Sequence, residues 1–366
     1  MLAPADMVFA QGPHAAFPQI PNQGGPRMAH PQIVPITFAD DPNRATIESF
    51  SKWIVGSTWM TTVGADYGFG SATVLGNVER TENAPDAVSL DGIESFISAG
   101  IADKSIPEPA GGDLSSVFYM VYYPVHTTIT AVDQSTGESS TSCVDFLAWH
   151  DYSQHATTPF AFTFIPTCVG GTPGLTDLES VESSASHELA EASSDPSWFK
   201  NPAFIIPKAS TTPWVLTGGE NGDMCSWEPA QWREGGFVAQ RIWSNSAALT
   251  TPSGDPCVPA IANDVYYNVS TTPDTFWMSA PGQVVNYTIQ GWSTAPMKPW
   301  TLEVDSPDLP ASSLHLSSKI MTNGGTAQLT VTIPATAKKG TNAMIEVFSS
   351  RSATDYHVWF AGIRIQ

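Results

Sequence analysis

The stretch Ser186-His187-Glu188-Leu189-Ala190-Glu191-Ala192-Ser193-Ser194-Asp195-Pro196 concentrates ionisable side chains in a chain of which only 14% of residues are charged. On a helix, His187 and Glu191 are four residues apart and share one face, so both side chains can reach one metal ion. Glu188 follows the first of these ligands, as the general base does in the zincin motif H-E-x-x-H. Glu191 replaces the second histidine of that motif, and a carboxylate is an acceptable zinc ligand.

A capped helix is expected around this stretch. Thr176 or Asp177 can cap its N-terminus, and acidic residues follow in the first turn. Apolar side chains recur at spacings of three and four residues, namely Leu178, Val181, Ala185 and Leu189. Pro196 marks the end, because helices usually stop at or before the residue that precedes a proline. The alternative interpretation is an acidic, solvated helix whose histidine is incidental.

A catalytic zinc site needs a third protein ligand and an open position for water. Asp195 is about 12 Å from His187 along an unbroken helix, so it could contribute only if the helix breaks before Pro196. The turn Gly218–Cys225 is the better source, because it carries Glu220 and Asp223, and we expect Glu220 to be the third ligand. An ordinary Asx-type turn is the alternative for this segment.

His150 is a further candidate for the third ligand. It lies in Trp149-His150-Asp151, at the end of an apolar run. A packed or hydrogen-bonded histidine at the end of a strand is the alternative interpretation.

Several segments carry a family resemblance. They are Tyr67–Ser71, Val117–Pro124, Cys143–His150, His187–Pro196, Glu220–Cys225 and Gln240–Asn245. Together they resemble the secreted proteins related to the plant EXORDIUM, or phosphate-induced, group and their bacterial relatives, over roughly residues 30–258. The resemblance implies an exported, extracellular protein and places these residues on motif positions: His150, His187, Glu188, Glu191, Asp195, Glu220 and Asp223. It implies no particular reaction, since the plant group is associated with the cell wall and growth.

Composition agrees with export. The formal net charge is −20, which argues against binding to nucleic acid or to anionic lipid. Low total charge with abundant serine, threonine, glycine and proline is typical of a β-rich secreted protein. No segment has the roughly 18 apolar residues of a membrane span. Residues 1–4 lack the features of an intact signal peptide.

The four cysteines allow three pairings. Their order and the intervening motifs favour Cys143–Cys168 and Cys225–Cys257, and the second bridge would hold the Glu220 turn near a strand at Trp243. Reduced thiols are the alternative, but they do not suit an exported chain.

The chain divides into three parts by pattern. Residues 1–33 are rich in proline, glycine and glutamine and are expected to form an arm or the remnant of a pro-segment. Residues 34–262 are expected to form an α+β zincin-like catalytic domain, with a buried strand at Val117–Tyr123 before the metal-binding helix. Its other expected elements are strands at Ile33–Phe38, Val144–His150 and Phe160–Pro166 and helices at Ala45–Ser57 and Leu90–Ala99.

Residues 263–366 carry short strands separated by turns. Leu329, Val331 and Ile333 alternate with polar residues, as in a half-buried strand. About seven such strands predict an all-β immunoglobulin-like sandwich without a disulfide. We expect either a spacer or a module that binds cell wall, polysaccharide or protein.

The main hypothesis is a secreted zinc metallopeptidase that cleaves protein or peptide substrates as a monomer. Metal-activated water would attack the peptide bond, and Glu188 would be the general base. The alternative is a non-catalytic extracellular protein that binds the cell wall or a surface and holds a structural ion, calcium among the candidates. A weaker alternative is a glycosidase that uses Glu188 and Glu220.

Overall fold

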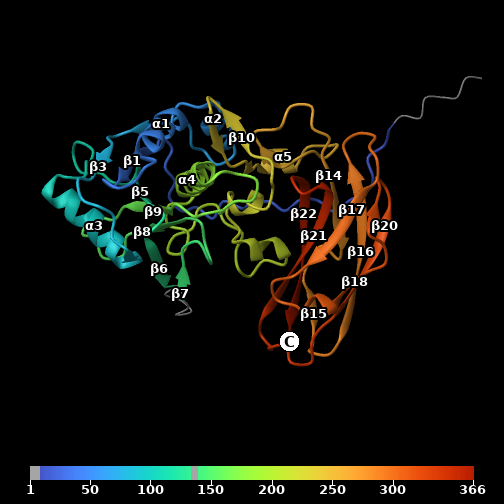
Figure 1. The fold of residues 1–366 in the computed structure, drawn as a ribbon. Helices are drawn as coiled ribbons and strands as arrows, with labels where there is room; N and C mark the ends of the chain where they lie inside the picture. Colours follow the sequence, from blue (N-terminus) through green and yellow to red (C-terminus); the bar gives the residue numbers. More distant parts are fainter. Residues whose placement is uncertain (1–8, 133–138) are drawn as a thin grey trace, which may run out of the picture.

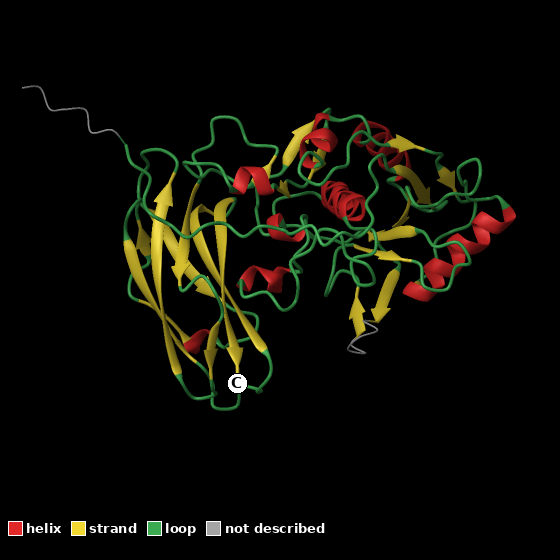
Figure 2. Cartoon of the chain, turned by 180° about the vertical axis from the view of Figure 1, so that it is seen from behind, coloured by secondary structure: helices red, strands yellow, loops and turns green. Residues whose placement is uncertain are grey.

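The structure, a computed structural model, describes residues 9–132 and 139–366. The chain is mostly β with few helices, and it has two parts (Figure 1). A mixed sheet with its helices lies at one end, and a β-sandwich lies at the other (Figures 1 and 2). Residues 1–4, whose sequence lacks signal-peptide features, lie outside the described residues.

The mixed sheet forms the centre of the N-terminal part. Its strand order is β2-β1-β5-β9-β8, with β3 beside β1. All of these strands are parallel except β8, which pairs antiparallel with β9 and ends the sheet. The strands are β1 (Gln32–Thr37), β2 (Thr73–Val74), β3 (Val78–Glu79), β5 (Val117–Tyr123), β8 (Trp149–Tyr152) and β9 (Ala161–Pro166).

Helices cover both faces of this sheet, as expected for parallel strands. Strand β5 is buried throughout, and its successive residues belong alternately to two different cores. One core includes residues of α1 (Arg44–Ile54), α2 (Thr58–Val63) and α4 (Asp177–Ser194). The other includes residues of α3 (Leu90–Asp103). The continuous apolar run therefore marks a central strand, as predicted.

The predicted strand over Val144–His150 is wrong in its first part. Strand β8 begins only at Trp149, and Val144 is exposed. A turn occupies the preceding segment: the Thr141 amide donates to the Asp145 carboxylate, and Cys143 has a positive φ of 63°. Beside this turn, β4 (Ala87–Ser89), β6 (Thr128–Val132) and β7 (Ser139–Thr141) form a small separate sheet that was not predicted.

Helix α4 begins and ends where the sequence indicates. Thr176 is the N-cap and forms a capping box with Glu179, and the helix ends at Ser194 with Asp195 as C-cap. Most of its residues are buried, Glu182, Glu188 and Glu191 among them. The alternative of a solvated acidic helix is therefore wrong. Strands β8, β9 and β11 (Phe237–Ala239) contact α4.

The segment after α4 is irregular and is held by a disulfide. Both predicted disulfides, Cys143–Cys168 and Cys225–Cys257, are present. The second joins the Glu220 turn to β13, which pairs with β12, the strand that contains Trp243. The short elements here are η1 (Pro213–Thr217), η2 (Asp223–Cys225), β10 (Trp232–Glu234), β11 (Phe237–Ala239), β12 (Ile242–Trp243), α5 (Asn245–Ala248) and β13 (Cys257–Val258).

The C-terminal part is a sandwich of two sheets, with orders β14-β16-β20-β18 and β15-β22-β21-β17-β19. Leu329, Val331 and Ile333 are buried, which confirms the predicted alternation. The elements are β14 (Tyr267–Thr272), β15 (Trp277–Ser279), β16 (Val284–Ser293), β17 (Trp300–Asp305), η3 (Ala311–Ser313), β18 (Leu314–Leu316), β19 (Ile320–Met321), β20 (Thr326–Thr332), β21 (Asn342–Ser352) and β22 (Asp355–Ile365).

Residues 9–31 form an extended arm that connects both parts (Figure 1). The Gly12 amide donates to Asn323 in the sandwich. Phe17 packs against Trp243, Trp292 and Trp359, where the two parts meet. Further along, the Met28 amide donates to the carbonyl of Ser193 in α4. Among the described residues, no helix is both long and apolar enough to cross a membrane.

Candidate metal centre

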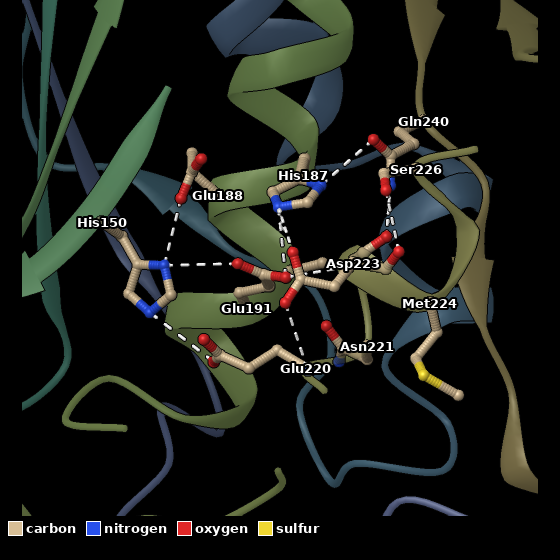
Figure 3. A network of polar contacts seen from close by, with 12 residues as sticks. His150, His187, Glu188, Glu191, Glu220, Asn221, Asp223, Met224, Ser226 and Gln240 are labelled. Carbon is tan, nitrogen blue, oxygen red and sulfur yellow. Dashed lines mark hydrogen bonds and ion pairs between the residues drawn. The ribbon is translucent and has the colours of Figure 1, made fainter. Parts of the chain in front are cut away.

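Three segments bring ionisable side chains together beside α4 (Figure 3). Helix α4 contributes His187 and Glu191, which are about one turn apart, and Glu188, which follows His187. Strand β8 contributes His150, the turn between η1 and η2 contributes Glu220, and Asp223 is the first residue of η2. The structure thus gathers six of the seven residues on the predicted motif positions, and Asp195 is treated separately below.

Glu191 is the central residue of this cluster. Its Oε1 is 3.1 Å from His187 Nε2, and its Oε2 is 3.4 Å from His150 Nδ1. Oε1 also accepts a hydrogen bond of 3.0 Å from the Asp223 amide. One carboxylate therefore contacts both histidines and the turn, which explains why the helix and the turn approach so closely.

His187 is held in one tautomer by Gln240. The Gln240 side-chain nitrogen donates to the Gly222 carbonyl at 2.7 Å, so its Oε1 faces His187 Nδ1, 3.1 Å away. Because that oxygen can only accept, Nδ1 carries the proton. Nε2 faces the carboxylates of Glu191 and, at 3.8 Å, Asp223, and there it holds either a proton or, through its lone pair, a metal ion. Metal-binding histidines in proteins are oriented in the same way.

Each ring nitrogen of His150 has a carboxylate nearby. Its Nδ1 is 3.0 Å from Glu188 Oε2, and its Nε2 is 3.7 Å from Glu220 Oε1. Among the described residues, His150 Nε2 and Glu220 Oε1 are both buried without a hydrogen-bond partner. Two such atoms facing each other are costly unless a proton or a metal ion lies between them. The His150 ring lies between the carboxylates of Glu188 and Glu220.

The turn needs glycine where it passes α4. A Cβ atom on Gly222 would lie 2.8 Å from Glu191 Oε1 and 2.8 Å from His187 Nδ1. Gly218 has a φ of 124°, and a Cβ atom there would overlap the Asp223 carboxylate. The backbone of the turn is anchored to β12 by a hydrogen bond from the Trp243 amide to the Asn221 carbonyl.

Asp195 lies outside the contacts of this cluster. The helix ends just before Asp195, as it must if Asp195 is to bind the same metal ion as His187. However, Asp195 Oδ1 accepts a hydrogen bond of 2.9 Å from the Ala203 amide. Burial raises its pKa to about 6. We therefore assign Asp195 to holding the chain that leaves α4.

Burial and mutual proximity shift the pKa values of the cluster. Burial opposes protonation of His187, but the Glu191 carboxylate outweighs it and raises the His187 pKa to about 10. The pKa of His150 is likewise raised, against burial, by Glu220, Glu188 and Glu191. Burial and the Glu191 charge raise the pKa values of Glu220 and Asp223 well above their usual range. The cluster therefore attracts positive charge, as a proton or as a metal ion.

The donor atoms fit a transition metal better than calcium. Two groups of three residues place one ligand atom each within 4.8 Å of the others: His150, Glu191 and Glu220, and His187, Glu188 and Glu191. Imidazole nitrogen with carboxylate oxygen suits zinc, whereas calcium takes six to eight oxygen ligands. Of the predicted ligands, His187 and Glu191 contact each other, whereas Glu220 contacts His150.

A cavity of about 1020 Å³ is lined by sequence neighbours of the cluster residues, though by none of the six cluster residues themselves. Trp149 and Asp151, the neighbours of His150 on β8, line one side. Gly218, from the start of the Glu220 turn, lines another. Apolar residues form much of the remaining wall, among them Trp198, Phe199, Ile205, Ile206, Val215 and Leu216.

Comparisons with known proteins leave the family open. No protein-family model matches the chain, and no curated protein matches it. The resemblance to the EXORDIUM group therefore stays a prediction.

Similar solved structures cover about a quarter of the chain. The Bacteroides ovatus GH5 xyloglucanase in complex with a XXXG heptasaccharide is 13% identical, with a TM-score of 0.20, over 27% of this chain and 19% of the xyloglucanase. The titin M3 domain is 13% identical, with a TM-score of 0.18, over 25% of this chain and 88% of that domain. The BIgI domain of the beta protein from S. agalactiae bound to CEACAM1 is 14% identical, with a TM-score of 0.19, over 28% of this chain and 97% of that domain. This chain spans about a fifth of the length of the xyloglucanase.

Two residues of the site carry no role in the sequence analysis. Gln240 lies within one of the segments of the resemblance, but a lone glutamine has no spacing that links it to His187. Gly222 is one of several glycines in its turn, and only its approach to α4 distinguishes it. Both become recognisable only when the turn and the helix are seen together.

Proposed function

We propose that the chain is a secreted, zinc-dependent peptidase. The observation that carries this proposal is the environment of His187: Gln240 holds its Nδ1, and its Nε2 faces Glu191 at 3.1 Å and Asp223 at 3.8 Å. We take His187, Glu191 and Asp223 as the zinc ligands. Asp223 replaces the expected Glu220 in this set because Glu220 contacts His150 instead, at 3.7 Å. The two disulfides agree with export.

The residues around the ligands suit hydrolysis. Zinc, when bound, supplies a Lewis acid that activates water and polarises a carbonyl group. Glu188 follows His187 in the helix and would take the proton from the attacking water and give it to the leaving amine. His150 Nδ1 donates to Glu188 Oε2 at 3.0 Å, so His150 orients the carboxylate of this base.

The adjacent cavity suits an extended peptide. Strand β8 ends the mixed sheet, and its Trp149 and Asp151 side chains line the cavity. An extended chain can add to the edge of such a sheet through backbone hydrogen bonds. Apolar side chains of a substrate would then contact the apolar wall of the cavity.

The test combines metal analysis with one isosteric substitution. Glu188→Gln should retain zinc and lose hydrolysis of a mixed peptide library by at least about a hundredfold, the usual contribution of a general base. Glu182→Gln is the matched control: Glu182 is a buried glutamate of the same helix that accepts a hydrogen bond from the Val238 amide and does not contact the cluster. Retained hydrolysis in Glu188→Gln would rule out this mechanism.

One observation favours a second candidate, a non-catalytic extracellular protein with a structural ion. Four residues of the cluster are almost closed to solvent, with exposed fractions of 2% for His150, 4% for Glu188, 3% for Glu191 and 7% for Glu220, whereas the side chains of His187 and Asp223 are 15% and 24% exposed. A structural site is closed in this way, whereas a catalytic site keeps one position open. This candidate predicts that chelation lowers the melting temperature while no peptide is cleaved. Its partner would be a cell-wall component or another surface ligand.

A further inference from the structure

We infer that the cluster is a two-metal centre in which the Glu191 carboxylate bridges a cation at His187 and a second cation at His150 and Glu220. This inference rests on the proposed function for the first cation and adds the second. It explains the shared position of Glu191 in both groups of potential ligands.

The second site is built from buried, unpartnered atoms. His150 Nε2 and Glu220 Oε1 lie 3.7 Å apart, and neither has a hydrogen-bond partner among the described residues. The other ring nitrogen, Nδ1, donates to Glu188 Oε2 at 3.0 Å. That hydrogen bond orients His150 with the lone pair of Nε2 toward Glu220, in the way that a carboxylate orients a metal-binding histidine.

Glu191 has one oxygen for each cation. Oε1 is 3.1 Å from His187 Nε2, and Oε2 faces the His150 ring, 3.4 Å from Nδ1, while one ligand atom each of Glu191, His150 and Glu220 lie within 4.8 Å of one another (Figure 3). The two oxygens of one carboxylate can bind two metal ions about 3.5 to 4 Å apart, the separation of two-metal hydrolytic centres. The turn supports this arrangement, because the Asp223 amide donates to Oε1 and fixes the carboxylate.

Charge balance also favours two cations. Within the described part of the chain, the ion pairs of Glu188, Glu191, Glu220 and Asp223 involve no lysine or arginine, only His150 and His187. Two divalent cations would neutralise these four carboxylates in place of the protons that the metal-free cluster holds. Unpaired buried charge is expensive.

Zinc titration of the metal-free protein tests the pair. Protein stripped with a chelator is titrated with zinc chloride, freed of excess metal, and analysed for bound zinc. Wild type should bind about two zinc ions per chain, as two-metal centres do. His150→Ala and His187→Ala should each bind about one. Glu220→Gln replaces the carboxylate with an amide of similar shape. It should also bind about one zinc ion, and it serves in place of His150→Ala if that variant fails to fold.

The possible outcomes separate this inference from the proposed function. Saturation at one zinc that is lost in His187→Ala but kept in His150→Ala and Glu220→Gln would overturn the second site and leave the proposed peptidase intact. Saturation at one zinc that is lost in both histidine variants would show a single shared ion and overturn the pair. Zinc lost only in His150→Ala, or no zinc in wild type, would overturn the pair and the proposed ligand set together.

A spectroscopic measurement gives an independent readout of the bridge. Cobalt(II) in place of zinc should show magnetic coupling between two ions in wild type, because they share the Glu191 carboxylate. Each histidine variant should show one uncoupled ion. Two uncoupled ions in wild type would overturn the bridge.

Discussion

His357 Nδ1 lies 2.6 Å from Glu228 Oε2, and this buried pair joins β22 of the sandwich to the N-terminal part. Burial opposes protonation of His357, but Glu228 outweighs it and raises the pKa above 6.5. The folded state therefore binds this proton more tightly than the unfolded state does. The resulting stability is fully present below pH 6.5 and is lost as the pH rises through the folded-state pKa.

Replacing His357 with glutamine should remove this pH dependence. Melting temperatures measured from pH 6 to pH 9 should fall more steeply in wild type than in His357→Gln. His315→Gln is the control, because His315 lies exposed on β18. Parallel profiles in wild type and His357→Gln would show that the pair does not titrate in this range.

Gln240 should control metal affinity without touching the metal. Gln240→Ala removes the acceptor that fixes the His187 tautomer, so zinc affinity should fall about 10- to 100-fold, as for other supporting hydrogen-bond partners. Isothermal titration with zinc measures the change. Gln328→Ala, an exposed position on β20, should leave affinity unchanged. Equal affinity in Gln240→Ala and wild type would contradict the assigned tautomer.

Gly222 should tolerate no side chain. In Gly222→Ala, the new Cβ atom would lie 2.8 Å from Glu191 Oε1, which forces the turn away from α4. Zinc affinity should fall by at least about tenfold, a loss comparable to that of a supporting partner. Gly254→Ala is the matched control, because a Cβ atom there meets nothing within 4 Å. Zinc titration of both variants should separate them clearly, and indistinguishable affinities would refute the close approach.

Phe17 should hold the two parts of the molecule together. It is 4% exposed and lies 5.5 to 5.7 Å, between ring centroids, from Trp243, Trp292 and Trp359. Phe17→Ala should cost about 3 to 5 kcal/mol in the free energy of unfolding, as for other buried phenylalanines. Chemical denaturation measures this, with Phe199→Ala as control because Phe199 is 42% exposed. A small loss in Phe17→Ala would mean that the arm is not required for stability.

The parts of the fold with a strong local signal were predictable. Thr176 and Pro196 delimit α4 because capping and the loss of a backbone donor act within a few residues. The apolar run Val117–Tyr123 identifies a central strand because such a strand is buried on both faces. Strands of two or three residues, such as β15, β18 and β19, are too short to show an alternation.

The candidate site was predictable as a set of residues but not as a geometry. The spacing of His187 and Glu191 determines their contact because both lie on one helix. The partner of Glu220 depends on how the turn meets β8, which no local pattern encodes, and the turn places Glu220 near His150. For the same reason, Asp195 ends the helix as expected but binds the Ala203 amide.

The N-terminal arm has a consequence for the order of folding. Gly12 and Phe17 contact Asn323 and Trp359, so the first residues of the chain meet partners more than 300 positions away. During synthesis these partners emerge long after Phe17, and until then Phe17 and the tryptophans that it contacts remain apart. Contacts of such long range are slow to form. The arm therefore packs onto the sandwich late, after the sandwich residues that it contacts have been synthesised.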